Sequence, residues 1–268
     1  MRNYTVTILG TRGSVPVSGS QFMRYGCATT CVLVEIGSQP LVIDAGTGIM
    51  ALPERVLRHD QLTLLLSHTH ADHVMGLPIC KYVLTRGKRL DVFAVDRNGL
   101  SAQQQIERLM SPPLWPVGPG FMPADIRFHN IPSYMLEVED NIITAIEGVH
   151  PGGVTVFRVE ANRKSVVFMT DCTITKKVSP KLEAFAHGCD LLLCDGQYSE
   201  QEQKMRSTYG HNSWNMAVDF ADRCHAKRLM IIHHDPSRTD EELDAAAEAV
   251  KKRNPKYDFA KEGMVVEL

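Results

Sequence analysis

Three histidines and an aspartate lie within six residues, in the run HTHADH from His68 to His73. The preceding stretch, LTLLLS, is apolar and is typical of a buried strand. If that strand continues through His70, the side chains of His68 and His70 point to the same side, because side chains alternate along a strand. The turn that follows would bring Asp72 and His73 toward a second point nearby. Imidazole and carboxylate groups bind Zn²⁺, Mn²⁺ and iron, so the run predicts a metal site.

The same side chains would also fit a polar turn in which Asp72 only caps the following helix. Three histidines and an aspartate at the spacing HxHxDH rarely occur without a metal, however. Metal binding is therefore the favoured interpretation of this run.

Further histidines and aspartates follow the ends of expected strands. His150 lies in GVHPGG, Asp171 lies in VVFMTDC, and the adjacent pair His233 and His234 lies in LMIIHHDPSR. The carboxyl ends of strands are where the sites of α/β proteins collect, which makes Asp171 a candidate site residue. His150 alone would be ambiguous, and either member of the histidine pair could bind a ligand.

The strand pattern indicates two sheets. Apolar or alternating runs predict one set of strands at 4–10, 31–36, 40–44, 62–67 and 90–95, and a second set at 126–131, 134–138, 142–146, 154–159, 166–170, 191–194 and 229–233. Helices are predicted between them at 72–82, 100–110, 180–186, 213–223 and 240–252. The last helix begins with a capping box formed by Thr239 and Glu242. We expect an α/β fold in which residues 1–268 form one domain, with helices outside two sheets.

Composition excludes several classes of protein. The 268 residues are 44% hydrophobic, which is ordinary for a folded core, and 31 acidic against 29 basic residues give no general basic excess for nucleic acid. No apolar run approaches the ~20 residues that span a bilayer, and the first ten residues lack the apolar stretch of a signal peptide. Seven scattered cysteines with no CxxC pair argue against a disulfide framework. We expect a cytoplasmic protein without a membrane partner.

HTHADH matches the HxHxDH signature of the metallo-β-lactamase superfamily, and the chain resembles this family over essentially its whole length. LVIDAGTG, from Leu41 to Gly48, resembles the strand that precedes the signature and ends in an aspartate. That residue, Asp44, would lie beneath the metals. The resemblance implies the αβ/βα four-layer sandwich, with the metals at the edge where the two sheets meet.

The family also implies two divalent metal ions, with Zn²⁺ as the first choice and Mn²⁺ or iron as alternatives. In the family's arrangement the first metal would be held by His68, His70 and His150, the second by Asp72, His73 and His233, and both by Asp171. His233 is preferred to His234 because the expected strand runs directly into it. Two metals ~3.5–4 Å apart can hold a bridging hydroxide that acts as the nucleophile. Asp72 is counted both among the metal ligands and among the catalytic residues.

A later segment resembles the phosphodiesterase branch of the superfamily, which includes ribonuclease Z and cyclic-nucleotide phosphodiesterases. The matching residues are Asp195 after a strand and His211 in the run YGHNS. In that branch the histidine is a general acid, and its carboxylate partner keeps the imidazole protonated near neutral pH. The alternative is that His211 is an ordinary loop residue and that Asn212 or Ser213 caps the next helix.

Two other segments could touch the substrate. GTRGS near the amino terminus resembles the first glycine loop of the branch, and Arg12 and Arg24 could bind phosphate or could be solvated surface residues. Residues 99–124 read as a helix followed by an apolar lid over a small pocket. Trp115 or Phe121 in this insertion could stack on a base or could pack beneath the loop.

The favoured function is a metal-dependent phosphodiesterase that acts on a cyclic nucleotide or another small phosphodiester. Transfer-RNA 3′-processing is the first alternative, but the family's transfer-RNA-gripping arm has no room in the 20 residues between His150 and Asp171. Structured RNA is therefore the less favoured partner. A thioester or lactone hydrolase would not need Asp195 and His211, and a non-catalytic domain would not need the full ligand set. The sequence leaves open whether the chain forms a homodimer.

Overall fold

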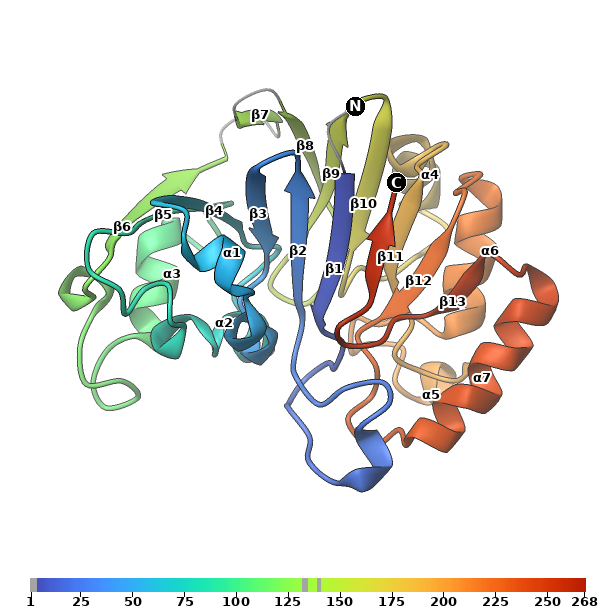
Figure 1. Cartoon of the computed structure of the whole chain (residues 1–268). Helices are drawn as coiled ribbons and strands as arrows, with labels where there is room; N and C mark the ends of the chain where they lie inside the picture. The colour runs from blue at the N-terminus through green and yellow to red at the C-terminus, as the bar shows by residue number, and fades with distance from the viewer. Residues whose placement is uncertain (1–3, 132–134, 139–140) are drawn as a thin grey trace.

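A computed structural model describes residues 4–131, 135–138 and 141–268, which form two seven-stranded sheets with helices outside them (Figure 1). Helices α1, α2 and α3 cover one sheet, and α4, α6 and α7 cover the other. Three hydrophobic clusters fill the two helix–sheet interfaces and the interface between the sheets. The predicted αβ/βα four-layer sandwich is thereby confirmed. The expected strand at 134–138 has one end, Tyr134, outside the described residues.

The first sheet has the order β14-β1-β2-β3-β4-β5-β6. Its strands are β1 (Tyr4–Gly10), β2 (Cys31–Ile36), β3 (Gln39–Ile43), β4 (Gln61–Leu65), β5 (Arg89–Ala94), β6 (Asp125–Asn130) and β14 (Val265–Glu267). Strands β3 to β6 run parallel to one another. Their carboxyl ends therefore lie along the same edge of this sheet.

The second sheet has the order β13-β12-β11-β10-β9-β8-β7. Its strands are β7 (Met135–Val138), β8 (Asn141–Glu147), β9 (Thr155–Ala161), β10 (Lys164–Met169), β11 (Leu191–Asp195), β12 (Leu229–Ile232) and β13 (Tyr257–Phe259). Strands β10 to β13 are parallel. Strand β8 has the same direction as β10, because both pair antiparallel with β9.

Seven α-helices connect the described strands. They are α1 (Glu54–Leu57), α2 (Ala71–Val74), α3 (Ala102–Leu109), α4 (Ser179–Ala186), α5 (Glu200–Met205), α6 (Trp214–Arg223) and α7 (Asp240–Arg253). The capping box predicted for α7 is present, since the side chain of Thr239 accepts from the backbone N–H of Glu242 and the Glu242 carboxylate accepts from that of Thr239. None of the helices within the described residues has the length and apolar character needed to cross a bilayer.

The expected helix at 72–82 is wrong. Helix α2 ends at Val74, and only a short 3-10 turn, Leu77–Ile79, follows it. The cause is Gly76, whose N–H donates to the carbonyl of Ala45 and so leaves the helical ladder. A Cβ at Gly76 would lie 2.2 Å from the carbonyl oxygen of Gly46, so the close contact between these two backbone segments requires glycine.

The insertion at 99–124 packs along β5 and β6. It contains α3, with Ser101 as its N-cap, and a 3-10 turn, Pro119–Phe121. Trp115 packs against the hydrophobic cluster beneath, whereas Phe121 is 80% exposed. The tip of this segment therefore projects into solvent while its helix is anchored to the first sheet.

Arg12 has a structural position rather than a place facing the substrate. Its side chain is fully buried and donates to the carbonyl oxygens of Gly26, Asp235 and Arg238 at 2.7, 3.2 and 2.7 Å. It thereby ties the amino-terminal loop to the loop after β12. Arg24 is half-exposed and pairs with Asp244 at 2.7 Å.

This difference predicts unequal costs for removing the two arginines. Arg12→Met should lower the free energy of unfolding by about 2–4 kcal/mol, because three buried carbonyl groups lose their donor. Arg24→Met is the matched control and should cost less than about 1 kcal/mol, as is usual for an exposed ion pair. Denaturant unfolding followed by circular dichroism measures both. Equal losses in the two variants would contradict the structural role of Arg12.

Candidate metal centre

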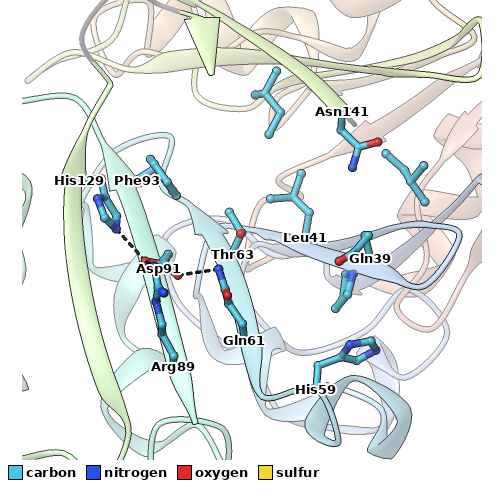
Figure 2. A pocket seen from close by; sticks show the side chains of 13 residues that line it. Gln39, Leu41, His59, Gln61, Thr63, Arg89, Asp91, Phe93, His129 and Asn141 are labelled. Carbon is cyan, nitrogen blue, oxygen red and sulfur yellow. Dashed lines mark hydrogen bonds and ion pairs between the residues drawn. The ribbon is translucent and has the colours of Figure 1, made fainter. Parts of the chain in front are cut away.

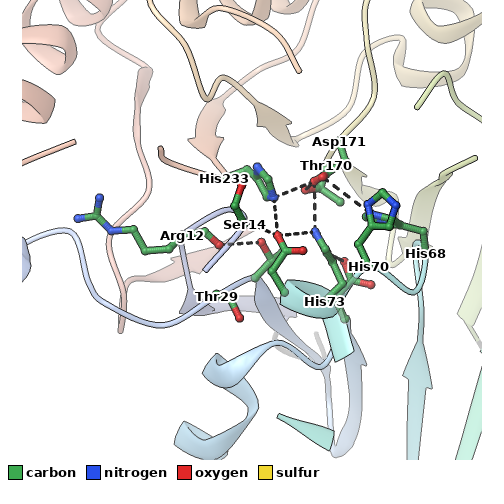
Figure 3. A network of polar contacts seen from close by, with 12 residues as sticks. Arg12, Ser14, Thr29, His68, His70, His73, Thr170, Asp171 and His233 are labelled. Atoms are coloured by element: carbon green, nitrogen blue, oxygen red, sulfur yellow. Dashed lines mark hydrogen bonds and ion pairs between the residues drawn. The ribbon is translucent and has the colours of Figure 1, made fainter. Parts of the chain in front are cut away.

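The loops that follow β3, β4, β8, β10, β11 and β12 bring histidines and aspartates together. Figure 3 shows the part of this cluster that contains His68, His70, His73, Asp171 and His233. Three groups of side chains are close enough to share an ion: His68, His70, His150 and Asp171; Asp72, His73, Asp171 and His233; and Asp171, Asp195, His211 and His233. Asp171 belongs to all three. Every metal-ligand candidate from the sequence is therefore in one cluster.

The first group opens toward solvent. The Nε2 atoms of His68 and His150 lie 3.8 and 3.7 Å from Oδ2 of Asp171. His70 is exposed, and its Nδ1 lies 3.1 Å from Nε2 of His150. The strand β4 ends at Leu65, so the expectation that it continues through His70 is wrong. The histidines converge from a loop and not from strand alternation.

The second group is fully buried. Nε2 of His73 lies 3.3 Å from Oδ2 of Asp72 and 3.3 Å from Oδ1 of Asp171. Nε2 of His233 lies 3.1 Å from each of the same two oxygens. The two oxygens of Asp171 thus face different groups, with Oδ2 toward the first and Oδ1 toward the second. This is the placement that a carboxylate shared by two ions needs.

His234, the open alternative to His233, points elsewhere. Its Nε2 lies 2.8 Å from the carbonyl oxygen of Ala260, and its ring packs near Phe259. Burial lowers the pKa of His234 to about 3. His233 has a positive φ of 63°, which turns its side chain back into the cluster directly after β12.

Asp72 does not cap a helix. Residue His70 is the N-cap of α2. The Asp72 carboxylate instead accepts from the backbone N–H of Ser14 at 2.7 Å, which links the amino-terminal glycine loop to the cluster. That contact was not foreseen from the sequence, although the small residues in GTRGS are a signal for close backbone approach.

Asp44 holds the cluster from beneath. Its carboxylate accepts from the N–H and the hydroxyl of Ser67 and lies 2.7 Å from Nδ1 of His73. The bond to Nδ1 leaves Nε2 of His73 facing the second group. Burial raises the pKa of Asp44, although His73 beside it acts in the opposite direction. This arrangement is the one by which a carboxylate orients a metal-binding histidine.

The charge of the cluster fits divalent cations. Within the described residues, every ion pair of Asp44, Asp72, Asp171 and Asp195 is with a histidine and none is with lysine or arginine. Burying carboxylates without lysine or arginine partners costs free energy, and bound metal ions would offset that cost. Nε2 of His68 and Nε2 of His73 are also buried without a hydrogen-bond partner among the described residues.

The imidazoles of the first group are biased toward the neutral form that binds metals. Burial lowers the pKa of His68 well below its usual value, lowers that of His70, and lowers that of His150 to about 4. Burial also opposes charge on His73, but Asp171, Asp72 and Asp44 outweigh it and raise the His73 pKa. The second group therefore has the stronger negative potential of the two.

Asp195 and His211 form a pair beside the cluster. Nδ1 of His211 lies 2.7 Å from Oδ2 of Asp195, and both side chains are buried. Burial lowers the pKa of His211, but Asp195 outweighs this effect and raises it to about 9. Ser213 caps α6, as the alternative reading of YGHNS predicted, and Asn212 donates its N–H to Oδ1 of Asp195. The capping role and the histidine–aspartate pair therefore coexist.

Two residues near the cluster were not predicted as site residues, although Asn212 was named as a possible helix cap. The hydroxyl of Thr170 donates to Oδ1 of Asp171 at 2.6 Å. The side chain of Asn212 links the loops after β10 and β11, since it donates to the carbonyl of Cys172 and accepts from the N–H of Ile174. Their only sequence signal was adjacency to Asp171 and His211.

A separate cavity of about 430 Å³ lies at the amino ends of β3, β4 and β5, away from the cluster (Figure 2). Asp91 in its wall accepts from Gln61 and Arg89 and lies 2.7 Å from Nε2 of His129. His129 also stacks on Phe93. The side chain of His129 therefore has its polar and ring contacts within the wall of this cavity.

The fold and the cluster define a metallo-β-lactamase-type hydrolase, a class that implies divalent metal ions. The sequence-family model for the β-lactamase superfamily domain matches residues 40–234, so the chain belongs to this family. Ribonuclease Z of Lachnoclostridium phytofermentans is 23% identical over 284 residues, covering 87% of this chain and 88% of the relative. The resemblance to the superfamily is confirmed, and this relative supports the ribonuclease Z-like branch.

Solved structures share the fold over the full chain. The metallo-β-lactamase fold protein YhfI from Bacillus subtilis superposes with a TM-score of 0.72 at 19% identity and covers 100% of both chains. A diphosphatase from the PhnP family superposes with a TM-score of 0.71 at 16% identity and covers 99% of this chain and 97% of that one. These likenesses confirm the architecture and do not identify the substrate.

Metal content gives a direct test of the two groups. Wild-type protein purified without chelator should contain about two equivalents of a divalent metal, as in two-metal sites. Asp72→Asn should lose about one equivalent, because Asp72 contacts only the second group. His70→Ala is the reciprocal variant and should lose metal from the first group. Elemental analysis of folded protein measures all three, and a folded wild-type chain with only trace metal would refute the assignment.

Proposed function

We propose that the protein is a binuclear metal-dependent phosphodiesterase that hydrolyses a cyclic nucleotide or another small phosphodiester. The observation that carries the proposal is the pairing of His211 with Asp195 next to two ligand groups that share Asp171. A hydrolase of carbonyl esters or thioesters needs the metals but not a protonated histidine at this place. Poor alkoxide leaving groups do need such a donor.

Different residues of the chain have different roles in the proposed reaction. When bound, the metals supply a water of lowered pKa and stabilise negative charge on the phosphoryl oxygens. The seven ligand candidates position those ions, and Asp44 and Ser14 fix the orientation of His73 and Asp72. Asp195 accepts from Nδ1 of His211, so the imidazole carries its second proton on Nε2. That proton is the one available to the departing alkoxide.

The role of His211 is tested by leaving-group dependence. His211→Ala should keep both metals and lose about 10²–10⁴-fold in kcat for an alkyl phosphodiester, the usual contribution of a general acid. The loss should be much smaller for a 4-nitrophenyl ester, whose leaving group needs no proton. Asp195→Asn should show the same selectivity in weaker form. An equal loss for both esters would indicate that His211 only binds substrate.

Transfer-RNA processing is the second candidate, because relatives of the chain include ribonuclease Z. Two observations favour a smaller substrate. Strands β9 and β10 are joined by a two-residue hairpin at Asn162 and Arg163, both with positive φ, which leaves no arm between His150 and Asp171. The net charge of −2 also supplies no general attraction for a polyanion.

Salt dependence separates the two candidates. We expect kcat/KM for a small diester to change little between low and moderate salt, because few phosphates are neutralised on binding. An enzyme that grips a transfer-RNA precursor should lose about 10³-fold or more over the same range. Parallel assays on a cyclic nucleotide and on precursor transfer RNA measure this. Accurate precursor cleavage with steep salt dependence and no diester turnover would move the function to RNA processing.

A further inference from the structure

A second cavity, of about 330 Å³, adjoins the solvent-facing side of the histidine and aspartate cluster. His68 and His70 of the first group form one wall, and Gly152 and Gly153, which follow His150, form another. The insertion at 99–124 forms the opposite side. A volume of this size accommodates one small substituent of a substrate whose phosphate lies at the metals.

The charged side chains in the wall of this cavity are basic. Arg97 and Arg108 line it together with the two histidines, and no carboxylate among the described residues does so. Arg97 is already neutralised, since its guanidinium binds both oxygens of Glu147 at 2.6 and 3.2 Å and the hydroxyl of Thr155 at 2.7 Å. Arg108 has no ion pair or hydrogen bond with any described residue.

Arg108 is presented by a well-anchored helix. The capping box of Ser101 and Gln104 starts α3, and Ala102 and Ile106 pack into the hydrophobic cluster beneath it. One turn before Arg108, the buried Gln105 donates to the carbonyls of Val95 and Leu100. Its Oε1 accepts from the hydroxyl of Thr69, between His68 and His70. The helix is thereby tied to the metal-binding loop itself.

We propose that Arg108 forms an anion subsite that binds a second phosphate group on the substituent occupying this cavity. The inference rests on the proposed phosphodiesterase function and names its substrate class: a phosphodiester that also carries a terminal phosphate. An unpaired guanidinium beside a cavity without acids binds phosphate through paired N–H donors. Arg97 cannot take this role without leaving Glu147. Leu100, Leu109 and Leu114 supply the apolar remainder of the wall.

The experiment uses two chromogenic esters that differ only in one phosphate, thymidine 5′-(4-nitrophenyl phosphate) with and without a 3′-phosphate. The wild-type metal-loaded enzyme should prefer the 3′-phosphorylated ester through a lower KM. Arg108→Gln should raise KM for that ester by about 10- to 100-fold, the range for a charge-assisted hydrogen-bonded pair, and leave kcat unchanged. The ester without the 3′-phosphate should be affected by less than about twofold. Arg108→Lys should recover part of the preference.

Arg86→Gln is the matched control, because Arg86 is also exposed and has no ion pair or hydrogen bond with any described residue, but it does not line the cavity. It should change neither ester. No preference in the wild type, or an equal change for both esters in Arg108→Gln, would overturn the subsite.

Binding is measured in parallel by calorimetry with thymidine 3′,5′-bisphosphate and thymidine 5′-phosphate. If neither ester is hydrolysed, the phosphodiesterase proposal fails while the subsite is still decided. Tighter binding of the bisphosphate that disappears in Arg108→Gln supports the subsite, and equal binding of the two nucleotides refutes it.

Discussion

The buried carboxylate of Asp171 is the interaction on which the rest of the site depends. It lies between two sets of imidazoles, and its ion pairs among the described residues are all with histidines. A carboxylate in that position is stable only if positive charge reaches it, which protonated histidines or bound divalent cations would supply. The fold brings the histidines to this carboxylate by converging six strand ends on one point. The parallel directions of β3 and β4 in one sheet and of β10 to β12 in the other make that convergence geometrically available.

The chain turns sharply at this point, and the strain is local. Asp44, Asp171 and His233 all have positive φ, at 59°, 51° and 63°, and each lies at or just beyond the end of a strand. Left-handed backbone costs a residue other than glycine about 1 kcal/mol, although aspartate and histidine tolerate it better than most. The turns are what direct these side chains back between the sheets. Hydrogen bonds such as those from Ser67 to Asp44 hold the strained turns in place.

Much of this could be predicted from the sequence, and the failures have physical causes. Twelve strands followed from apolar runs, but β13 and β14 have only three residues each, too few to show a period. The candidate ligands His68, His70, Asp72 and His73 followed from the local spacing of HTHADH. The family resemblance added His150, Asp171 and His233, and the structure brings all seven side chains together. The helix at 72–82 was wrong because Gly76 bonds to Ala45, far away in sequence. For Arg12 the sequence left phosphate binding and a solvated surface position open, and both were wrong, because its buried partners after β12 are set only by the tertiary fold.

The two sides of the metal cluster are built from different parts of the fold. His211, Asp195 and Asn212 are buried and hydrogen-bonded to one another, with Asp195 at the end of β11 and the other two in the segment between α5 and α6. The opposite side is formed by the insertion at 99–124, where Arg108 is exposed and has no partner among the described residues and Leu114 is 72% exposed. Changes in the first part would affect the His211–Asp195 pair to which the proposed proton donation is assigned. None of the residues of the insertion belongs to a ligand group, although Gln105 accepts a hydrogen bond from Thr69 in the loop that carries His68 and His70. Under the proposed function, the reacting groups come from the loops at the strand ends, while exposed residues of the insertion such as Arg108 and Leu114 can vary without loss of a candidate metal ligand.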